Sequence, residues 1–305
     1  MASFKYNKEE ITPESINAFI LSSKNQNDKN NKTRENIIGA IMNGKVPNEF
    51  YEIPQWKEKK ENIFSFISQL TNNKKYNKIE CEHKGGRKFN YDFDITIYYD
   101  DGSIVIENIE LKFNTPSIAG APQFVSPVKP SQYINNDMSF EEYHYTNYLP
   151  KIAELYGGLP IPPLEEYLKQ VGGDNPKCMK PYQDNYYKGS KQSSRFTNNE
   201  EDIRLYDECK KISYESIKNY INESDLNIEK LSKYLVDTQK NKKYMLYYDN
   251  KFILQTVNNL DDYIIESVTK TANTYNCVSK SGKNITILLR WKNGNGIAFP
   301  AFQIN

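Results

Sequence analysis

The sequence has few of the residues from which disulfide frameworks, zinc sites and serine hydrolases are built. Its 305 residues include four cysteines, which are widely scattered without a Cys-x-x-Cys pair, and only two histidines. A structural zinc site is not expected, because it requires clustered cysteine and histidine ligands. Two histidines and the lack of a Gly-x-Ser-x-Gly motif leave little basis for a Ser-His triad. ATP-driven translocation is not expected either, since the Gly-x-x-x-x-Gly-Lys-[Ser/Thr] loop is missing.

Long hydrophobic runs are also missing. No stretch approaches the ~20 apolar residues of a membrane-spanning helix, and the N-terminal residues lack the apolar core of a signal peptide. We therefore expect an intracellular, cytoplasmic protein with no membrane partner. The 40 Lys and Arg residues nearly balance the 39 Asp and Glu residues, which argues against a polyelectrolyte but allows an enzyme with a local basic groove.

Hydrophobic periodicity divides the rest of the chain into alternating helical and β regions. Helices are expected within residues 10–70, interrupted by a polar loop at 24–33, and again within 139–240, with a loop at 174–197. A meander of three alternating strands is expected between them, at residues 76–113. This order predicts an α+β architecture with a mixed sheet.

Two regions follow from that pattern. We expect a main domain over residues 1–240, which contains the meander, and a C-terminal β-rich region over residues 241–305. The second region either completes the sheet of the first or forms a small subdomain that recognises nucleic acid.

The meander carries the residues that suggest chemistry. Side chains on a strand alternate between two faces, so Asp92 and Asp94 share one face of the second strand, and Glu110 and Lys112 share one face of the third. If Asp100–Gly102 forms a three-residue loop with a left-handed glycine, Glu110 lies opposite Asp92 and all four charged residues point the same way. A two-residue turn would put the aspartates on the other face. The Asp-Asp-Gly sequence favours the three-residue loop.

Crowded carboxylates repel one another and raise each other's pKa unless a cation neutralises them. Oxygen ligands alone suit Mg²⁺, or Mn²⁺ as a substitute, bound by Asp94, Glu110 and Asp92. Lys112 beside the metal could position or deprotonate the attacking water. The chemistry that this pattern predicts is metal-dependent phosphodiester hydrolysis. The alternative is an amphipathic strand with a solvated acidic face and an ordinary surface ion pair.

A helix followed by a hairpin with Asp on one strand and Glu-x-Lys on the next resembles the PD-(D/E)XK nuclease superfamily, which includes most type II restriction endonucleases. The matching residues are Asp94 or Asp92, with Glu110 and Lys112, and Asp94 followed by Ile-Thr-Ile resembles the family's motif aspartate better. No proline precedes either aspartate, which departs from the family pattern. The resemblance covers about a fifth of the chain and implies a restriction-endonuclease-like core, with Asp94, Glu110 and Lys112 as catalytic residues.

Further residues could assist such a site. Asn114 shares a strand face with Lys112, and Gln123 follows in the next segment. Glu35 or Glu61, on a preceding helix, is a candidate for an additional metal ligand, as in several restriction enzymes. His83 suggests an RNA alternative, because cap-snatching-type endonucleases pair a histidine with such acids. Each has a plainer structural interpretation as a strand end, a solvated helical glutamate or a packed strand histidine.

Basic and polar residues outside the meander could contact nucleic acid. Cations position the phosphate backbone, whereas Arg and Asn can read base edges. The candidate DNA-binding residues are Lys188, Lys191, Arg195, Arg290 and Asn293.

The expected function is therefore a Mg²⁺-dependent endonuclease of double-stranded DNA, sequence-specific in the manner of type II restriction enzymes and acting as a homodimer. A structure-selective or repair nuclease, or an RNA endonuclease, could use the same core. A nucleic-acid-binding module that does not cleave is a third possibility, and an unrelated interaction protein a fourth.

Overall fold

The computed structural model describes residues 3–20, 27–84, 89–120, 123–125, 130–172, 179–291 and 300–304. The chain forms two compact units, each built from separate stretches of sequence. The first comprises Met1–Ala121 and Asp237–Asn258, and the second Pro122–Val236 and Asn259–Asn305. The expected boundary at residue 240 lies near one of the three points at which the chain passes between units. In the described part of the chain, no helix is long and apolar enough to cross a membrane.

The first unit is organised around a five-stranded sheet with the strand order β10-β9-β5-β4-β3. Its strands are β3 (Tyr76–His83), β4 (Phe93–Tyr99), β5 (Ile104–Phe113), β9 (Lys243–Tyr248) and β10 (Lys251–Gln255). All neighbours are antiparallel except β5 and β9, which are parallel. The sheet is thus mixed, and the predicted α+β class is confirmed. Two strands from the C-terminal β-rich region complete it.

The β4–β5 turn has the geometry on which the predicted convergence of charges depends. Gly102 has a φ of 84°, and its N–H donates to the carbonyl of Tyr99 at 3.0 Å. Asp94 is paired with Asn108 across the two strands. Because only glycine adopts this left-handed conformation without strain, the Asp-Asp-Gly sequence selects the three-residue loop. The predicted register is confirmed.

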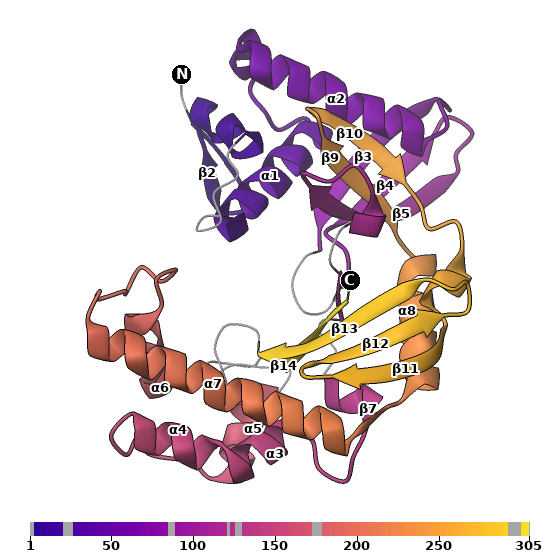
Figure 1. Cartoon of the computed structure of the whole chain (residues 1–305). Coiled ribbons are helices and arrows are strands. Elements are labelled where there is room, and N and C mark those ends of the chain that lie inside the picture. Colours follow the sequence, from indigo (N-terminus) through magenta and orange to yellow (C-terminus); the bar gives the residue numbers. More distant parts are fainter. Residues whose placement is uncertain are drawn as a thin grey trace. The chain divides into compact units, whose positions relative to one another are not determined.

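Helices cover one face of this sheet. They are η1 (Pro13–Phe19), α1 (Asn27–Met42), η3 (Asn48–Glu52) and α2 (Pro54–Leu70). Their apolar side chains pack on alternate residues of the central strands, including Phe93, Ile95 and Ile109, which are fully buried. The remaining small elements of this unit are β1 (Phe4–Tyr6), β2 (Glu9–Ile11) and η4 (Ile118–Gly120). Figure 1 shows α2 lying along β9 and β10.

The polar loop expected at residues 24–33 is wrong for its second half, because α1 already begins at Asn27. The hydrophobic pattern gave no sign of this, since the first turns of α1 contain no apolar residue. Polar contacts stabilise them instead: Arg34 is fully buried, and its guanidinium donates to Asn31 Oδ1 at 2.6 Å and to the Ala18 carbonyl at 2.7 Å.

The second unit combines helices with a second five-stranded sheet, of strand order β11-β12-β13-β14-β6. Its strands are β6 (Gln123–Val125), β11 (Ile265–Thr271), β12 (Thr274–Ser279), β13 (Asn284–Trp291) and β14 (Pro300–Ile304). Its main helices are α3 (Phe140–Asn147), α4 (Leu149–Leu155), α5 (Leu164–Gly172), α6 (Lys180–Gly189) and α7 (Glu200–Glu223). Helix α8 (Ile228–Lys240) leads from this unit back to the first. Shorter elements are η5 (Pro130–Tyr133), β7 (Ile134–Asn135), β8 (Asp225–Leu226) and η6 (Leu260–Tyr263).

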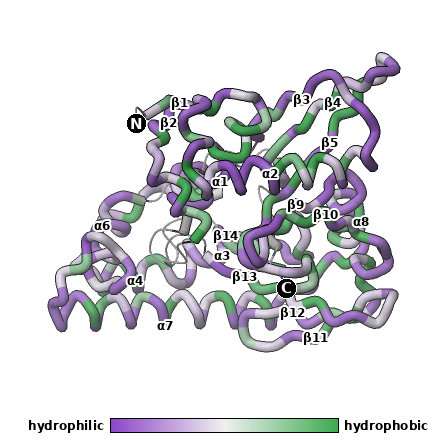
Figure 2. Tube along the Cα trace, turned by 90° about the horizontal axis from the view of Figure 1, so that it is seen from above, coloured by the Kyte–Doolittle hydropathy of each residue, from purple (hydrophilic) through white to green (hydrophobic). Residues whose placement is uncertain are grey.

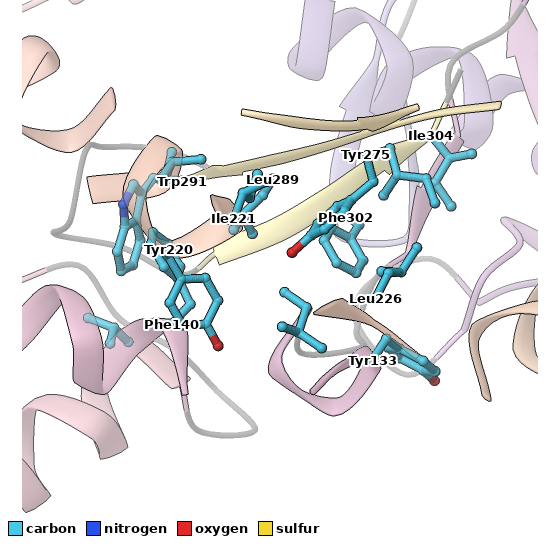
Figure 3. Packing of buried hydrophobic residues seen from close by; sticks show 14 of the residues in the cluster. Tyr133, Phe140, Tyr220, Ile221, Leu226, Tyr275, Leu289, Trp291, Phe302 and Ile304 are labelled. Carbon is cyan, nitrogen blue, oxygen red and sulfur yellow. The ribbon is translucent and has the colours of Figure 1, made fainter. Parts of the chain in front are cut away.

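Aromatic residues fill the core of the second unit. Phe140, Tyr220, Tyr275 and Phe302 are almost completely buried there, and Trp291 packs 5.1 Å from Phe140 between ring centroids (Figure 3). Hydrophilic and hydrophobic residues alternate along α7, which suits a helix that packs on one side only (Figure 2).

Local signals in the second unit were only partly interpreted correctly. Ser139 caps α3, its Oγ accepting from the Glu142 N–H at 3.2 Å. The loop expected at 174–197 is wrong, because α6 lies within it. The N-cap of α7 is Asn199, whose side-chain oxygen accepts from two backbone N–H groups of the first turn.

Candidate functional site

The polar face of β4 and β5 lies opposite the helices. Because Phe93 and Ile109 point into the buried core, their neighbours Asp94 and Glu110 are directed to the other face of the sheet. Lys112 shares that face two residues further along β5. The first unit therefore holds the predicted acidic residues and the lysine on one surface.

Asp92 lies directly before the first residue of β4, beside β5. Its backbone N–H donates to the Ile109 carbonyl at 2.9 Å, and its Oδ2 accepts from the Leu111 N–H at 2.8 Å. The Leu111 N–H of β5 therefore pairs with a side-chain carboxylate, where a regular sheet would supply a backbone carbonyl. Beyond this point β5 no longer pairs with β4 but continues beside β9 as far as Phe113. Asp92 is consequently fixed at the opening between two strands.

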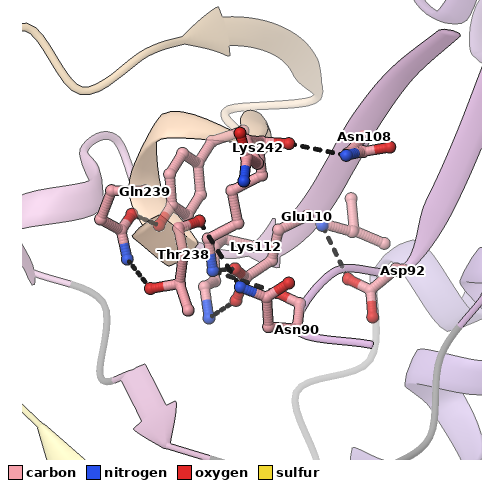
Figure 4. Close-up of polar contacts among 11 residues, drawn as sticks. Asn90, Asp92, Asn108, Glu110, Lys112, Thr238, Gln239 and Lys242 are labelled. Atoms are coloured by element: carbon pink, nitrogen blue, oxygen red, sulfur yellow. Dashed lines mark hydrogen bonds and ion pairs between the residues drawn. The ribbon is translucent and has the colours of Figure 1, made fainter. Parts of the chain in front are cut away.

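Glu110 is held between two lysines (Figure 4). Lys112 Nζ lies 2.5 Å from Glu110 Oε1, and Lys242 pairs with Glu110 Oε2. Only 6% of the Lys242 side chain is exposed, and its Nζ also donates to the Asn90 carbonyl at 3.0 Å. Lys242 therefore connects the central glutamate to the segment that leads into Asp92.

Sequence reasoning missed Lys242. It lies between α8 and β9, far from Glu110 in sequence, and becomes its neighbour because β9 pairs with β5. The Asn108 side chain helps to fix this junction by donating to the Asn241 carbonyl at 2.7 Å. Lys242 and Lys243 look like any other pair in a lysine-rich chain, so no local signal distinguishes them.

The two acids of the cluster differ in their electrostatic environments. Burial, followed by the negative charge of Glu35, raises the pKa of Asp92 to about 7, and Glu110 adds to this effect. Burial would also raise the pKa of Glu110, but the charges of Lys112 and Lys242 outweigh it and hold that pKa below its ordinary value. Positive charge thus compensates the burial of Glu110, whereas Lys112 compensates the burial of Asp92 only in part.

A second acid reaches the cluster from α1. Glu35 influences Asp92 electrostatically, and its Oε2 lies 2.6 Å from His83 Nε2 on β3. The hydrogen bond to Glu35 raises the pKa of His83. Arg34, the preceding residue on α1, packs its guanidinium 3.4 Å from the centre of the Phe113 ring and so ties this helix to β5. Of the two helical glutamates considered, Glu35 lies at the cluster, whereas Glu61 is exposed on α2.

Asp94 has its own partner. Its Oδ2 lies 3.2 Å from Lys84 Nζ, and Lys84 also pairs with Glu82 at 2.9 Å. Asp94 shares the sheet face of Glu110, but its negative charge is balanced on the β3 side. The contacts therefore favour Asp92 over Asp94 as the aspartate that acts with Glu110 and Lys112.

The remaining candidate residues are distributed over both units. Asn114 ends β5 with a φ of 57°, and its N–H donates to the Tyr247 carbonyl at 2.8 Å. Arg195 pairs with Asp184, and Arg290 donates to Gln303 Oε1 at 2.9 Å. Several candidates belong to the second unit: Gln123, Lys188, Lys191, Arg195 and Arg290. Asn293 lies outside the described residues.

The donor set can be compared with what a divalent cation requires. Within the described ranges, no group of three or more His, Cys, Asp or Glu side chains is arranged to hold a metal ion. Mg²⁺ is commonly bound through only one or two carboxylates, with water and substrate phosphate completing its shell. Asp92 and Glu110 meet that smaller requirement, and the raised pKa of Asp92 reflects its burial and the negative charge of Glu35. The residues present fit Mg²⁺ in this limited sense.

Comparison with protein-family models, with curated proteins and with solved structures finds no match for this chain.

Proposed function

We propose that this chain is a Mg²⁺-dependent endonuclease built on a restriction-endonuclease-like core. The observation that carries the proposal is the meeting of Asp92, Glu110 and Lys112 where β4 separates from β5. A buried cluster of opposite charges contributes little to stability, because desolvation offsets most of the attraction between the charges. Strongly shifted pKa values at such a cluster are typical of functional sites.

Each residue has a role that its surroundings support. Asp92 and Glu110 would hold the metal, and Lys112 would donate hydrogen bonds to the attacking water or to the phosphate. When bound, Mg²⁺ supplies Lewis-acid polarisation of the phosphate and lowers the pKa of the water. Lys242 would act through Glu110, since it fixes that carboxylate from the side opposite Lys112.

Double-stranded DNA, cut at a defined sequence by a homodimer, is the substrate and assembly that the superfamily resemblance suggests. The pairing of His83 with Glu35 beside Asp92 supports the alternative of RNA cleavage on the same core. A protein that binds nucleic acid without cutting it is a further alternative, because Lys112 and Lys242 already neutralise Glu110.

The test is incubation of the purified protein with long unmodified DNA, in Mg²⁺, Mn²⁺ or EDTA. We expect metal-dependent fragments from the wild type and from Lys243→Ala, and none from Lys112→Ala. Lys243 is a matched control, because it pairs with Glu107 rather than with the cluster. Discrete fragments would establish sequence specificity, and a smear would discard the specificity but keep the chemistry. No cleavage of DNA or RNA with any metal would refute the proposal.

A further inference from the structure

Two aromatic side chains precede Asp92 on the segment that enters β4. Phe89 is 37% exposed, although its ring is large and apolar. Tyr91 lies beside it, with 5.5 Å between the ring centroids and an angle of 59° between the planes. Tyr91 is half-buried, and neither ring belongs to the buried cluster that forms the core of the first unit. The pair is a surface feature that lies within three residues of the site.

This aromatic pair is fixed to the charged cluster. Asn90, between the two rings, accepts a hydrogen bond from Lys242, the lysine that pairs with Glu110. The Asn90 side-chain amide also contacts the Thr238 carbonyl at 3.5 Å. The backbone that carries the two rings is thus anchored to the residues that surround Glu110.

A cation accompanies the rings. Lys84 Nζ lies 5.4 Å from the centre of the Phe89 ring, within the range of a cation–π contact. The same ammonium group is paired with Asp94 and Glu82, which fixes its position. Aromatic rings are the surface on which sites for single-stranded nucleic acid stack bases, and the fixed Lys84 side chain holds the Phe89 ring beside the cluster.

We infer that Phe89 and Tyr91 form a stacking site for an unpaired nucleobase next to the phosphodiester bond at the Asp92–Glu110–Lys112 cluster. This inference rests on the proposed function, and it narrows the substrate class. A base within a duplex presents no free face, so a stacking site selects a strand with an unpaired nucleotide at the cleavage position. The preferred substrate is then a single strand, or a duplex with a bulge or splayed end.

The experiment measures binding without metal, by fluorescence anisotropy of labelled 20-nucleotide probes in EDTA. The probes are oligothymidine, oligouridine, an abasic strand of the same length and a blunt duplex. We expect the wild type to bind oligothymidine or oligouridine more tightly than the abasic strand or the duplex. Phe89→Ala should weaken binding of the base-containing single strands roughly 5- to 100-fold and leave the abasic strand unaffected. Phe89→Trp should restore it.

Ile104→Ala is the matched control, because Ile104 is 60% exposed on the same sheet but lies at the hairpin end of β5, away from Glu110. The inference is overturned if Phe89→Ala binds every probe as the wild type does, or if it weakens the abasic strand as much as oligothymidine. Comparison of oligothymidine with oligouridine shows whether the base comes from DNA or from RNA.

A separate measurement in Mg²⁺ distinguishes failure of this inference from failure of the proposed function. Base-dependent binding that needs Phe89, without cleavage in any metal, would keep the stacking site and refute the nuclease. If Phe89→Ala cleaves paired and bulged duplexes as fast as the wild type does, the proposed nuclease activity is retained and the stacking site is refuted.

Discussion

The two compact units both bury polar groups, but they do so differently. In the first, charged residues from separate strands surround Glu110, and two lysines share one carboxylate. In the second, His144 is fully buried, and its Nδ1 is hydrogen-bonded to Ser216 at 2.9 Å. Its other neighbours are aromatic rings, among them Trp291 at 5.0 Å between centroids.

The difference bears on the proposal that the first unit carries the functional site. A histidine buried among aromatic rings is held in its neutral form, because burial disfavours its charge. Buried charges, in contrast, cost several kcal/mol each in desolvation, and replacing them with apolar residues is often stabilising. The first unit retains such charges where a strand pair opens, which is expected when they serve a ligand rather than the fold.

The largest effect should separate two buried glutamates, one from each unit. Glu110→Gln is expected to lower cleavage by at least ~100-fold, because the neutral amide loses its charge toward metal and lysine alike. Glu141→Gln is the counterpart in the second unit, where Glu141 is 3% exposed and accepts from Ser131. We expect this second variant to lower the unfolding midpoint without changing kcat/KM. Equal losses of cleavage activity in Glu110→Gln and Glu141→Gln would contradict the expectation that only Glu110 serves catalysis.

Asp92→Asn should stabilise the metal-free protein while abolishing cleavage. The pKa of Asp92 is raised to about 7 in the folded state from an ordinary value near 3.8, so the folded state binds more protons between these values. Stability contributed by this group therefore falls as pH rises from about 4 to 7. The substitution removes the free-energy cost of ionising Asp92 in the folded state, which is about 4 kcal/mol at pH 8 and less than half of that at pH 5.

Urea denaturation in EDTA at the two pH values measures this effect. The asparagine oxygen can still accept from the Leu111 N–H, so the local backbone is retained. A variant that is less stable than the wild type at pH 8 would show that Asp92 is a structural acid.

The β meander could be predicted because short-range rules determine it. Asp100–Gly102 specifies the loop, the loop specifies the register, and the register places Glu110 with the aspartates. The same rule could not choose between Asp92 and Asp94, since residues two apart share a face. The choice depends on where β4 begins and on Lys84, which pairs with Asp94.

Long-range pairing accounts for what the sequence did not reveal. Lys242 reaches Glu110 only because β9 returns to lie beside β5 after the chain has passed through the second unit. Helix α1 begins among polar residues, where hydrophobic periodicity carries no signal. These features depend on tertiary contacts between distant segments, which a local pattern does not encode.

The smallest effect concerns the two histidines, whose pH signatures should be opposite. Burial lowers the pKa of His144 to about 3, below the ordinary value of 6.5, so the unfolded chain binds the additional proton. Stability of the second unit is therefore present above pH 6.5 and is lost as pH falls, by about 2 kcal/mol at pH 5. The pKa of His83 is raised by Glu35, so its contribution to stability is present at low pH and is lost as pH rises through its folded pKa.

The free energies of unfolding of His144→Gln and His83→Gln at pH 5 and 7, compared with those of the wild type, measure both contributions. His144→Gln should remove the loss on acidification, and His83→Gln should be most destabilising at pH 5. If both variants respond to pH with the same sign, the two units do not differ in how they bury charge.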